Sequence, residues 1–163
     1  MNQLYEAFPT VEDRTKIAKP IVVTLASIAE TILYDLIVTR IQSFTREGVE
    51  NIPESTLEYI RDRSIDKFGT IIDQCRKHDL LKSPLIYDQL TILSRARNRI
   101  HIQNDKNQDP QDECSLFTTE FLSTTECTVE LLVRKMLELY PRVHNHVDEF
   151  EFPWEPHHPD GQN

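Results

Sequence analysis

Glycine, cysteine and tryptophan are scarce in this sequence: 163 residues include only three glycines, three cysteines and one tryptophan. All-β folds usually use many more glycines in their turns, so the scarcity argues against a sheet-based fold. The nine prolines mark the ends of segments and leave long stretches that suit helices. The composition therefore predicts an all-α protein, which is long enough to bury a core as one domain.

Long apolar runs are also lacking. No uninterrupted stretch of about eighteen apolar residues occurs, so the sequence predicts no membrane span. The first twenty residues carry Glu6, Glu12 and Asp13 and have no apolar core of a secretory signal. We therefore expect a cytoplasmic protein.

The three cysteines, Cys75, Cys114 and Cys127, are an odd number with wide, irregular spacing. They fit neither a disulfide framework nor a Cys-x-x-Cys metal site. The sequence predicts reduced, partly buried thiols.

The charge is unbalanced, with 27 acidic and 18 basic residues and a net charge of −9. This argues against non-specific binding of nucleic acid over the whole surface. The basic residues are unevenly spread, however, because Arg95, Arg97 and Arg99 fall within five residues. A local basic site remains compatible with the composition.

Apolar spacing predicts a first long helix over residues 16–46. Its apolar residues recur every three or four positions, which is the period of one helix face: Ile17, Ile21, Leu25, Ile28 and Ile32. Gly48 is the expected C-cap residue of this helix.

A second helix is expected to run to about Leu81. Ser55 and Glu58 have the spacing of a capping box, in which each side chain satisfies a free backbone N–H group at the start of a helix. Gly69 lies inside the segment and predicts a kink or a break into two shorter helices.

A third helix is predicted over residues 85–101 and a fourth over residues 111–140, closed by Pro141. Short connections between long helices favour an antiparallel bundle of four to five helices. The expected organisation is an N-terminal arm (1–15), a helical bundle (16–140) and an extended or disordered acidic tail (141–163).

The tail has no sustained apolar period. We expect its aromatic residues to dock on a partner or on the bundle: Phe150, Phe152 and Trp154. Four of its histidines, with acids nearby, could ligate a transition metal: His144, His146, His157 and His158. No metal site is predicted, because ligands need a preorganised scaffold.

The third predicted helix carries the most distinctive chemistry. Its apolar period, through Ile86, Leu90 and Leu93, places Arg97 where an apolar residue is expected. At about 100° per residue, Asn98 and His101 lie on the same side of the last turns as Arg97. A buried arginine needs an anionic partner.

Two interpretations of this cluster are open. In the structural one, Arg97 pairs with a carboxylate of another helix, namely Glu30, Asp35 or Glu126. His101 then only caps the C-terminal end of its helix, where the helix dipole favours a cation. In the functional one, the guanidinium, the amide and the imidazole converge on one ligand.

The segment Leu93-Ser-Arg-Ala-Arg-Asn-Arg-Ile-His-Ile-Gln-Asn104 resembles the signature of HEPN domains (higher eukaryotes and prokaryotes nucleotide-binding). In these small helical bundles, a late helix carries an Arg, usually followed by a polar residue such as Asn, and then a His after four to six intervening residues. Arg95 has the right spacing to His101 but is followed by Ala96. Arg97 is followed by Asn98, yet only three residues separate it from His101. Both arginines therefore remain candidates.

The resemblance implies metal-independent cleavage of RNA in a composite site between two protomers, without a cofactor. His101 would act as general acid or base, and Arg97 or Arg95 would stabilise charge on the phosphate. Asn98 would orient the histidine or the phosphate, and Arg99 and Arg95 would bind RNA.

Endoribonucleases of this kind occur in toxin–antitoxin and antiviral defence systems. The expected partners are a second copy of the chain, RNA, and an antitoxin or defence-system protein. The alternative is a non-catalytic HEPN bundle that serves dimerisation, nucleotide or RNA binding, or assembly with a partner. A plain helical scaffold is a third possibility.

Overall fold

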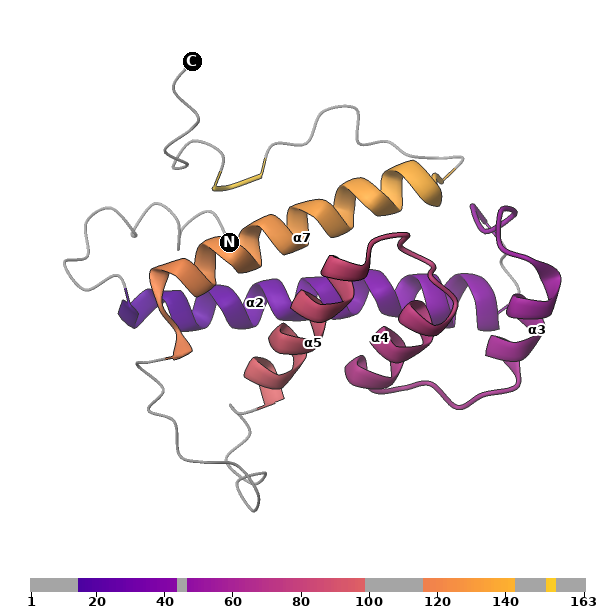
Figure 1. Ribbon diagram of the computed structural model, residues 1–163, viewed down its shortest axis with the longest axis horizontal. Coiled ribbons are helices and arrows are strands. Elements are labelled where there is room, and N and C mark those ends of the chain that lie inside the picture. The colour runs from indigo at the N-terminus through magenta and orange to yellow at the C-terminus, as the bar shows by residue number, and fades with distance from the viewer. Residues whose placement is uncertain (1–14, 44–46, 99–115, 143–151, 155–163) are drawn as a thin grey trace.

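The computed structural model describes residues 15–43, 47–98, 116–142 and 152–154. All regular structure in these residues is helical, which confirms the all-α prediction (Figure 1). The helices are α2 (Thr15–Tyr34), its π-helical continuation η2 (Asp35–Gln42), α3 (Glu54–Arg61), α4 (Phe68–Lys77), α5 (Pro84–Asn98) and α7 (Thr119–Leu139).

The central element is α2, which runs on into η2 and lies against both α5 and α7. Its buried face is centred on Val22, Leu25, Ala29 and Leu33. The expected face was slightly misplaced, because Ile28 is 37% exposed. Other helices cover α2 from several sides. The spacing of its apolar residues therefore does not show which side of the helix stays exposed.

By length and composition alone, one described helix, Ile17–Gln42, could cross a membrane. The sequence predicted no membrane span because Thr and Ser residues interrupt the apolar run of this helix. Thr24, Ser27 and Thr31 each donate to the carbonyl four residues earlier, over 2.8–3.0 Å. Of its most apolar window, 44% is buried in the protein, and core helices of soluble proteins pass the same test. The helix is therefore only weak evidence for a membrane.

The long helices α2 and α7 run side by side in the same direction (Figure 1). At their beginnings, Lys19 lies over the ring of Phe117. At their ends, Arg40 donates to the carbonyl of Tyr140. The antiparallel prediction is therefore wrong for this pair. Four helices were expected, but the second one is broken into α3 and α4. The last helix is therefore the fifth in the described chain and not the fourth.

The break separates α3 from α4 at residues 62–67, just before Gly69. It confirms the prediction of two shorter helices. The capping-box prediction is wrong, because α3 begins at Glu54 with Pro53 as its N-cap and has no side-chain cap bond. The fixed φ of Pro53 and the carbonyl it offers to Leu57 start the helix instead.

The last helix, α7, starts later than expected, at Thr119. The hydroxyl of Thr118 accepts a hydrogen bond from the backbone N–H of Phe121 and so caps it. The expected start at residue 111 lies outside the described residues. The third predicted helix is confirmed as α5 up to Asn98, and residues 99–101 lie outside the described part.

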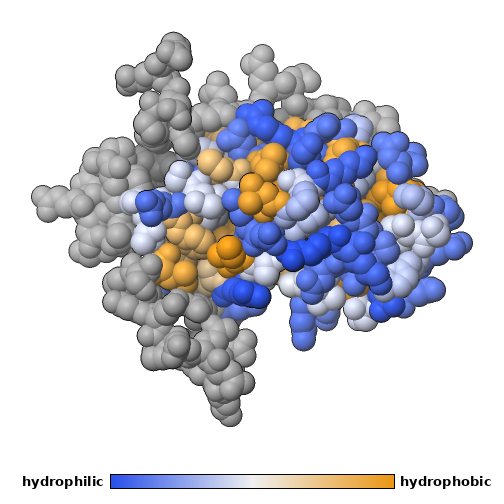
Figure 2. Space-filling model, viewed as in Figure 1, coloured by the Kyte–Doolittle hydropathy of each residue, from blue (hydrophilic) through white to orange (hydrophobic). Residues whose placement is uncertain are grey.

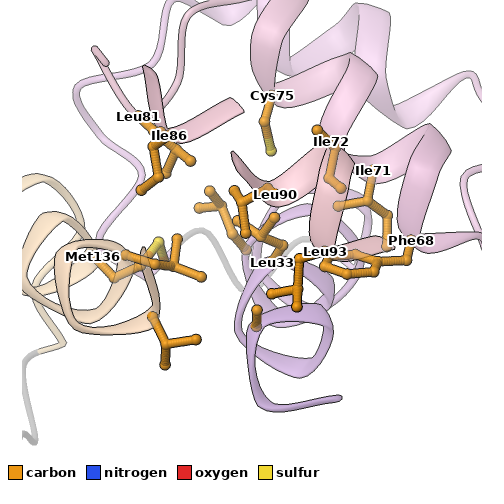
Figure 3. Packing of buried hydrophobic residues seen from close by; sticks show 14 of the residues in the cluster. Leu33, Phe68, Ile71, Ile72, Cys75, Leu81, Ile86, Leu90, Leu93 and Met136 are labelled. Carbon is orange, nitrogen blue, oxygen red and sulfur yellow. The ribbon is translucent and has the colours of Figure 1, made fainter. Parts of the chain in front are cut away.

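The core lies where α2, α4, α5 and α7 meet (Figure 3). Figure 3 shows the side chains of α4 and α5 converging on Leu33 of α2, with Met136 of α7 closing one side. Cys75 belongs to this core, and burial raises the pKa of its thiol to about 12. Cys75 and Cys127 are both free thiols, as predicted, and Cys114 lies outside the described residues.

Two aromatic residues of the predicted tail, Phe152 and Trp154, pack into the same core. Their rings stack with centroids 4.8 Å apart, and each side chain is about 5% exposed or less. The prediction that the tail docks on its own bundle is confirmed for these two residues. Phe150 lies outside the described residues.

Gly48 adopts a positive φ of 71° and lies against the backbone that follows α7. A Cβ at this position would be 2.3 Å from the carbonyl oxygen of Pro141. Gly48 therefore serves close packing of two backbones, and the prediction that it caps the first helix is wrong. The first helix, with its continuation η2, ends at Gln42, six residues before Gly48, and Ser43 is its C-cap residue.

Replacing Gly48 with alanine is expected to lower the free energy of unfolding by about 2 kcal/mol, because it adds both backbone strain and overlap with Pro141. Urea unfolding followed by circular dichroism measures this loss. Gly69 is the matched control, since a Cβ there meets nothing within 4 Å. Gly69→Ala should leave stability unchanged or raise it, and an equal loss in both variants would contradict the packing argument.

Candidate functional site

Three of the five predicted site residues lie on the last turns of α5. Arg95 and Asn98 are exposed, and Arg97 is half-buried between them on the side that faces α2. Arg99 and His101, the remaining predicted site residues, lie outside the described residues. The structure therefore places three of the five predicted residues and separates the two candidate arginines onto different sides of the helix.

Arg97 forms a bidentate ion pair with Glu30 of α2. Nη2 lies 2.7 Å from Oε2, and Nη1 donates to Oε1 over 3.2 Å. The two side chains are 28% and 23% exposed. Two parallel N–H···O bonds fix both the distance and the orientation of the partners. The structural interpretation of Arg97 is thus confirmed, with Glu30 as the partner.

The other two carboxylates that the sequence offered to Arg97 lie elsewhere. Asp35, the first residue of η2, binds Arg40 and Arg142. Glu126 is buried on α7. Glu30 is the carboxylate that α2 brings to the height of the last turns of α5.

Arg95 has a different environment. It is exposed, and among the described residues it has no ion-pair partner. It shares one face of α5 with Leu85 and Ile92, which are 63% and 50% exposed. Asp88 lies on the same face and pairs with Arg76 of α4 at 3.0 Å. The guanidinium of Arg95 is consequently the one in the described motif that can meet an anionic ligand without first breaking an ion pair.

Small residues let α5 approach its neighbours closely at this end. Ser94 and Ala96 are 4% and 2% exposed. Sequence reasoning noted Ala96 only as a departure from the HEPN pattern, and the structure gives it a packing role. Closer to the start of α5, Gln89 accepts a hydrogen bond from the hydroxyl of Thr128 on α7 over 2.8 Å. This bond was not predicted, since neither residue stands out in its own segment.

A second polar cluster ties the ends of α2/η2 and α7 together. Arg40 is 7% exposed; its Nε lies 2.8 Å from Oδ2 of Asp35, and its Nη1 donates to the carbonyl of Tyr140 over 2.8 Å. Arg142 binds the same carboxylate at 2.6 Å. The i→i+5 pitch of a π-helix brings Asp35 and Arg40 to one side of the rod. The cluster holds helix ends together and offers no free cation to a ligand.

Between α5 and α7 lies a shallow groove lined by Ile92, Leu93 and Phe121 and by uncharged polar side chains. It has no cation for a phosphate. Within the described residues, no group of three or more His, Cys, Asp or Glu side chains could hold a metal ion. The four tail histidines lie outside that part of the chain.

No protein-family model, no curated protein and no solved structure matches this chain.

Proposed function

We propose that the protein is a metal-independent endoribonuclease of HEPN type, which cleaves RNA at the C-terminal end of α5. The observation that carries this proposal is the separation of the two arginines. Arg97 is held by Glu30, and Arg95 is exposed without an ion-pair partner among the described residues. Arg95 is also the arginine whose spacing to His101 fits the HEPN pattern, so we assign the phosphate-binding role to it.

The reaction needs no group beyond the side chains of the motif. His101 removes the proton from a ribose 2′-hydroxyl, whose oxygen attacks the adjacent phosphorus while the 5′-oxygen leaves. The leaving 5′-oxygen takes up a proton from a solvent water, and the products are a 2′,3′-cyclic phosphate and a 5′-hydroxyl. Arg95 stabilises the negative charge that builds on the phosphate oxygens. Arg97 positions α5 through its bond to Glu30, and Asn98 and Arg99 contact the RNA.

A second copy of the chain is the expected partner at this site. The exposed face of α5 combines Leu85 and Ile92 with Arg95. Figure 2 shows apolar areas scattered among polar side chains on this side of the molecule, where α2, α5 and α7 overlap in Figure 1. In a two-fold dimer through α5 the apolar residues would pack on their counterparts. The two Arg95 side chains would then face one cleft.

Control of such an activity would fall to an antitoxin or another defence-system protein. An acidic surface of that partner would cover Arg95 and block access of RNA. The proposal thus places the protein in a toxin–antitoxin or antiviral system.

The direct test is incubation of the purified protein with a mixed RNA pool in excess EDTA. We expect cleavage that leaves 2′,3′-cyclic phosphates and 5′-hydroxyls, and light scattering of the same sample should give a dimer. Treatment of the products with an enzyme that opens cyclic phosphates identifies the ends. A folded dimer that cuts no RNA, with or without divalent metal ions, would contradict the proposal.

The bidentate pair of Arg97 with Glu30 favours one second candidate, a non-catalytic HEPN module. The Arg-Asn dipeptide would then serve only to fasten α5 to α2, and the exposed face of α5 would bind a partner. In that case the dimer persists and RNA binds without being cut. Binding and cleavage assays on one preparation separate the two functions.

A further inference from the structure

A cluster of cationic and aromatic side chains lies where the C-terminal ends of α3 and α4 meet. Nζ of Lys77 donates to the hydroxyl of Tyr59 over 2.6 Å and lies 4.1 Å from the centre of its ring. The guanidinium carbon of Arg63 is also 4.1 Å from the ring centre. The ring of His78 approaches Tyr59 with centroids 5.0 Å apart. Two cations and a histidine therefore surround one tyrosine.

The backbone holds these groups in place from several sides. Gln42, at the end of η2, donates to the carbonyls of Ile60 and Arg63 and so fixes the turn in which Arg63 leaves α3. His78 is the C-cap residue of α4, with its N–H bonded to Gln74. The site is thus a built junction of two helices.

No carboxylate among the described residues pairs with Arg63 or Lys77. The neighbouring arginine, Arg76, does have a partner, because Asp88 binds it at 3.0 Å. Asp79, next to His78, accepts a hydrogen bond from Tyr87 on the α5 side. The dipole of α4 favours one cation at its end, but it does not explain a second cation that arrives from α3.

The pKa values of Tyr59 and His78, the two rings of the cluster, both lie below their ordinary values. The hydrogen bond from Lys77, together with the charges of Arg63 and Lys77, lowers the pKa of the Tyr59 hydroxyl. Burial first, and then the same two charges, lower the pKa of His78. Nε2 of His78 is buried and has no hydrogen-bond partner among the described residues. An anion would relieve the repulsion of the two cations, and the ring of His78, next to Tyr59, would report its binding.

We propose that Tyr59, Arg63 and Lys77, beside His78, bind a phosphomonoester, such as a terminal phosphate of a nucleotide or of an RNA end. Two cations without a carboxylate match the double negative charge of a phosphomonoester better than the single charge of a phosphodiester. The Tyr59 hydroxyl accepts from Lys77 and keeps its own proton to donate to a phosphate oxygen. Figure 1 shows this junction at the end of the molecule away from the last turn of α5, so the site is separate from the proposed cleavage site.

The test is a titration of the full chain with inorganic phosphate at pH 7.5, followed by NMR of the His78 and Tyr59 side chains. Sodium chloride at equal ionic strength is the reference. We expect saturable shifts of both residues and a rise in the pKa of His78. Lys77→Met and Arg63→Met should each weaken binding about ten-fold. Lys135→Met, which removes a lysine paired with Glu138 on α7, should leave it unchanged.

Two nucleotide probes identify the ligand class. Adenosine monophosphate should reproduce the shifts, and a dinucleoside monophosphate, which carries only a phosphodiester, should not. Equal shifts in chloride, or unchanged phosphate affinity in both Lys77→Met and Arg63→Met, would overturn the proposal and leave a cluster that only covers the α3–α4 junction. The result does not depend on RNA cleavage, because none of these variants alters α5.

Discussion

Replacing Arg95 with alanine is expected to lower the rate of RNA cleavage about a hundred-fold or more and to leave the free energy of unfolding unchanged. The guanidinium is exposed and makes no ion pair with a described residue, so its loss costs little in the folded state. Its proposed role is to stabilise charge that exists only in the transition state. The measurements are the cleavage rate of a labelled RNA in EDTA and urea unfolding of the same preparation.

The same substitution at Arg97 should have a different profile. It breaks the bidentate bond to Glu30 and leaves that half-buried carboxylate without its arginine. We expect a loss of about 1–2 kcal/mol in stability, with a smaller effect on cleavage in the molecules that remain folded. His101→Ala should lose cleavage at least as strongly as Arg95→Ala. Lys67→Ala, at an exposed lysine just before α4, is the control and should change neither quantity appreciably.

The opposite pattern would reassign the motif. If Arg97→Ala abolished cleavage at unchanged stability while Arg95→Ala retained it, Arg97 would be the phosphate ligand and Glu30 would have to release it when RNA binds. If both arginine variants still cleaved RNA while His101→Ala did not, neither arginine would take part in the mechanism.

The sequence predicted those parts of the fold that depend on local signals. The apolar spacing of residues 16–46 gave the central helix, and the proline-marked start of α5 was confirmed within one residue. Placing Arg97 at an apolar position of α5 correctly implied a carboxylate partner, and Glu30 was among the three named. A charge on a buried face requires compensation, so this inference needed no knowledge of the fold.

Features that depend on the packing of distant segments were not predictable in this way. The direction of α7 relative to α2 depends on how all the helices between them pack, and the local composition of the chain does not set it. Gly48 is needed because the backbone at Pro141 lies against it, 93 positions later. The Tyr59 cluster joins side chains from α3 and α4. The sequence predicted a kink or break near Gly69, but not that the two shorter helices would bring Tyr59 and Lys77 together.

Arg40 is a buried charge in η2, whose other buried residues are apolar, and it has the largest expected effect on stability. Arg40→Ala should lower the free energy of unfolding by about 3–5 kcal/mol. The substitution removes the donor to the carbonyl of Tyr140, which ends α7, and one of the two cations on Asp35. The residue Tyr140 is only 5% exposed, so its carbonyl would lose its donor where water reaches it poorly. Urea unfolding monitored by circular dichroism measures the loss.

Two further variants separate the causes. Arg142→Ala removes the outer cation from Asp35, and since Arg142 is 46% exposed, a loss of about 1 kcal/mol or less is expected. Arg40→Met keeps most of the volume but neither hydrogen bond, so it should recover only the packing part of the loss. A loss below about 1 kcal/mol for Arg40→Ala would mean that α7 is held by its apolar face alone. The pair of Asp35 with Arg40 in η2 would then contribute little to stability. If the full loss is observed, the hydrogen bonds of Arg40 join the ends of the parallel helices α2/η2 and α7. The packing of α5 against these two helices then depends on Arg40 as well.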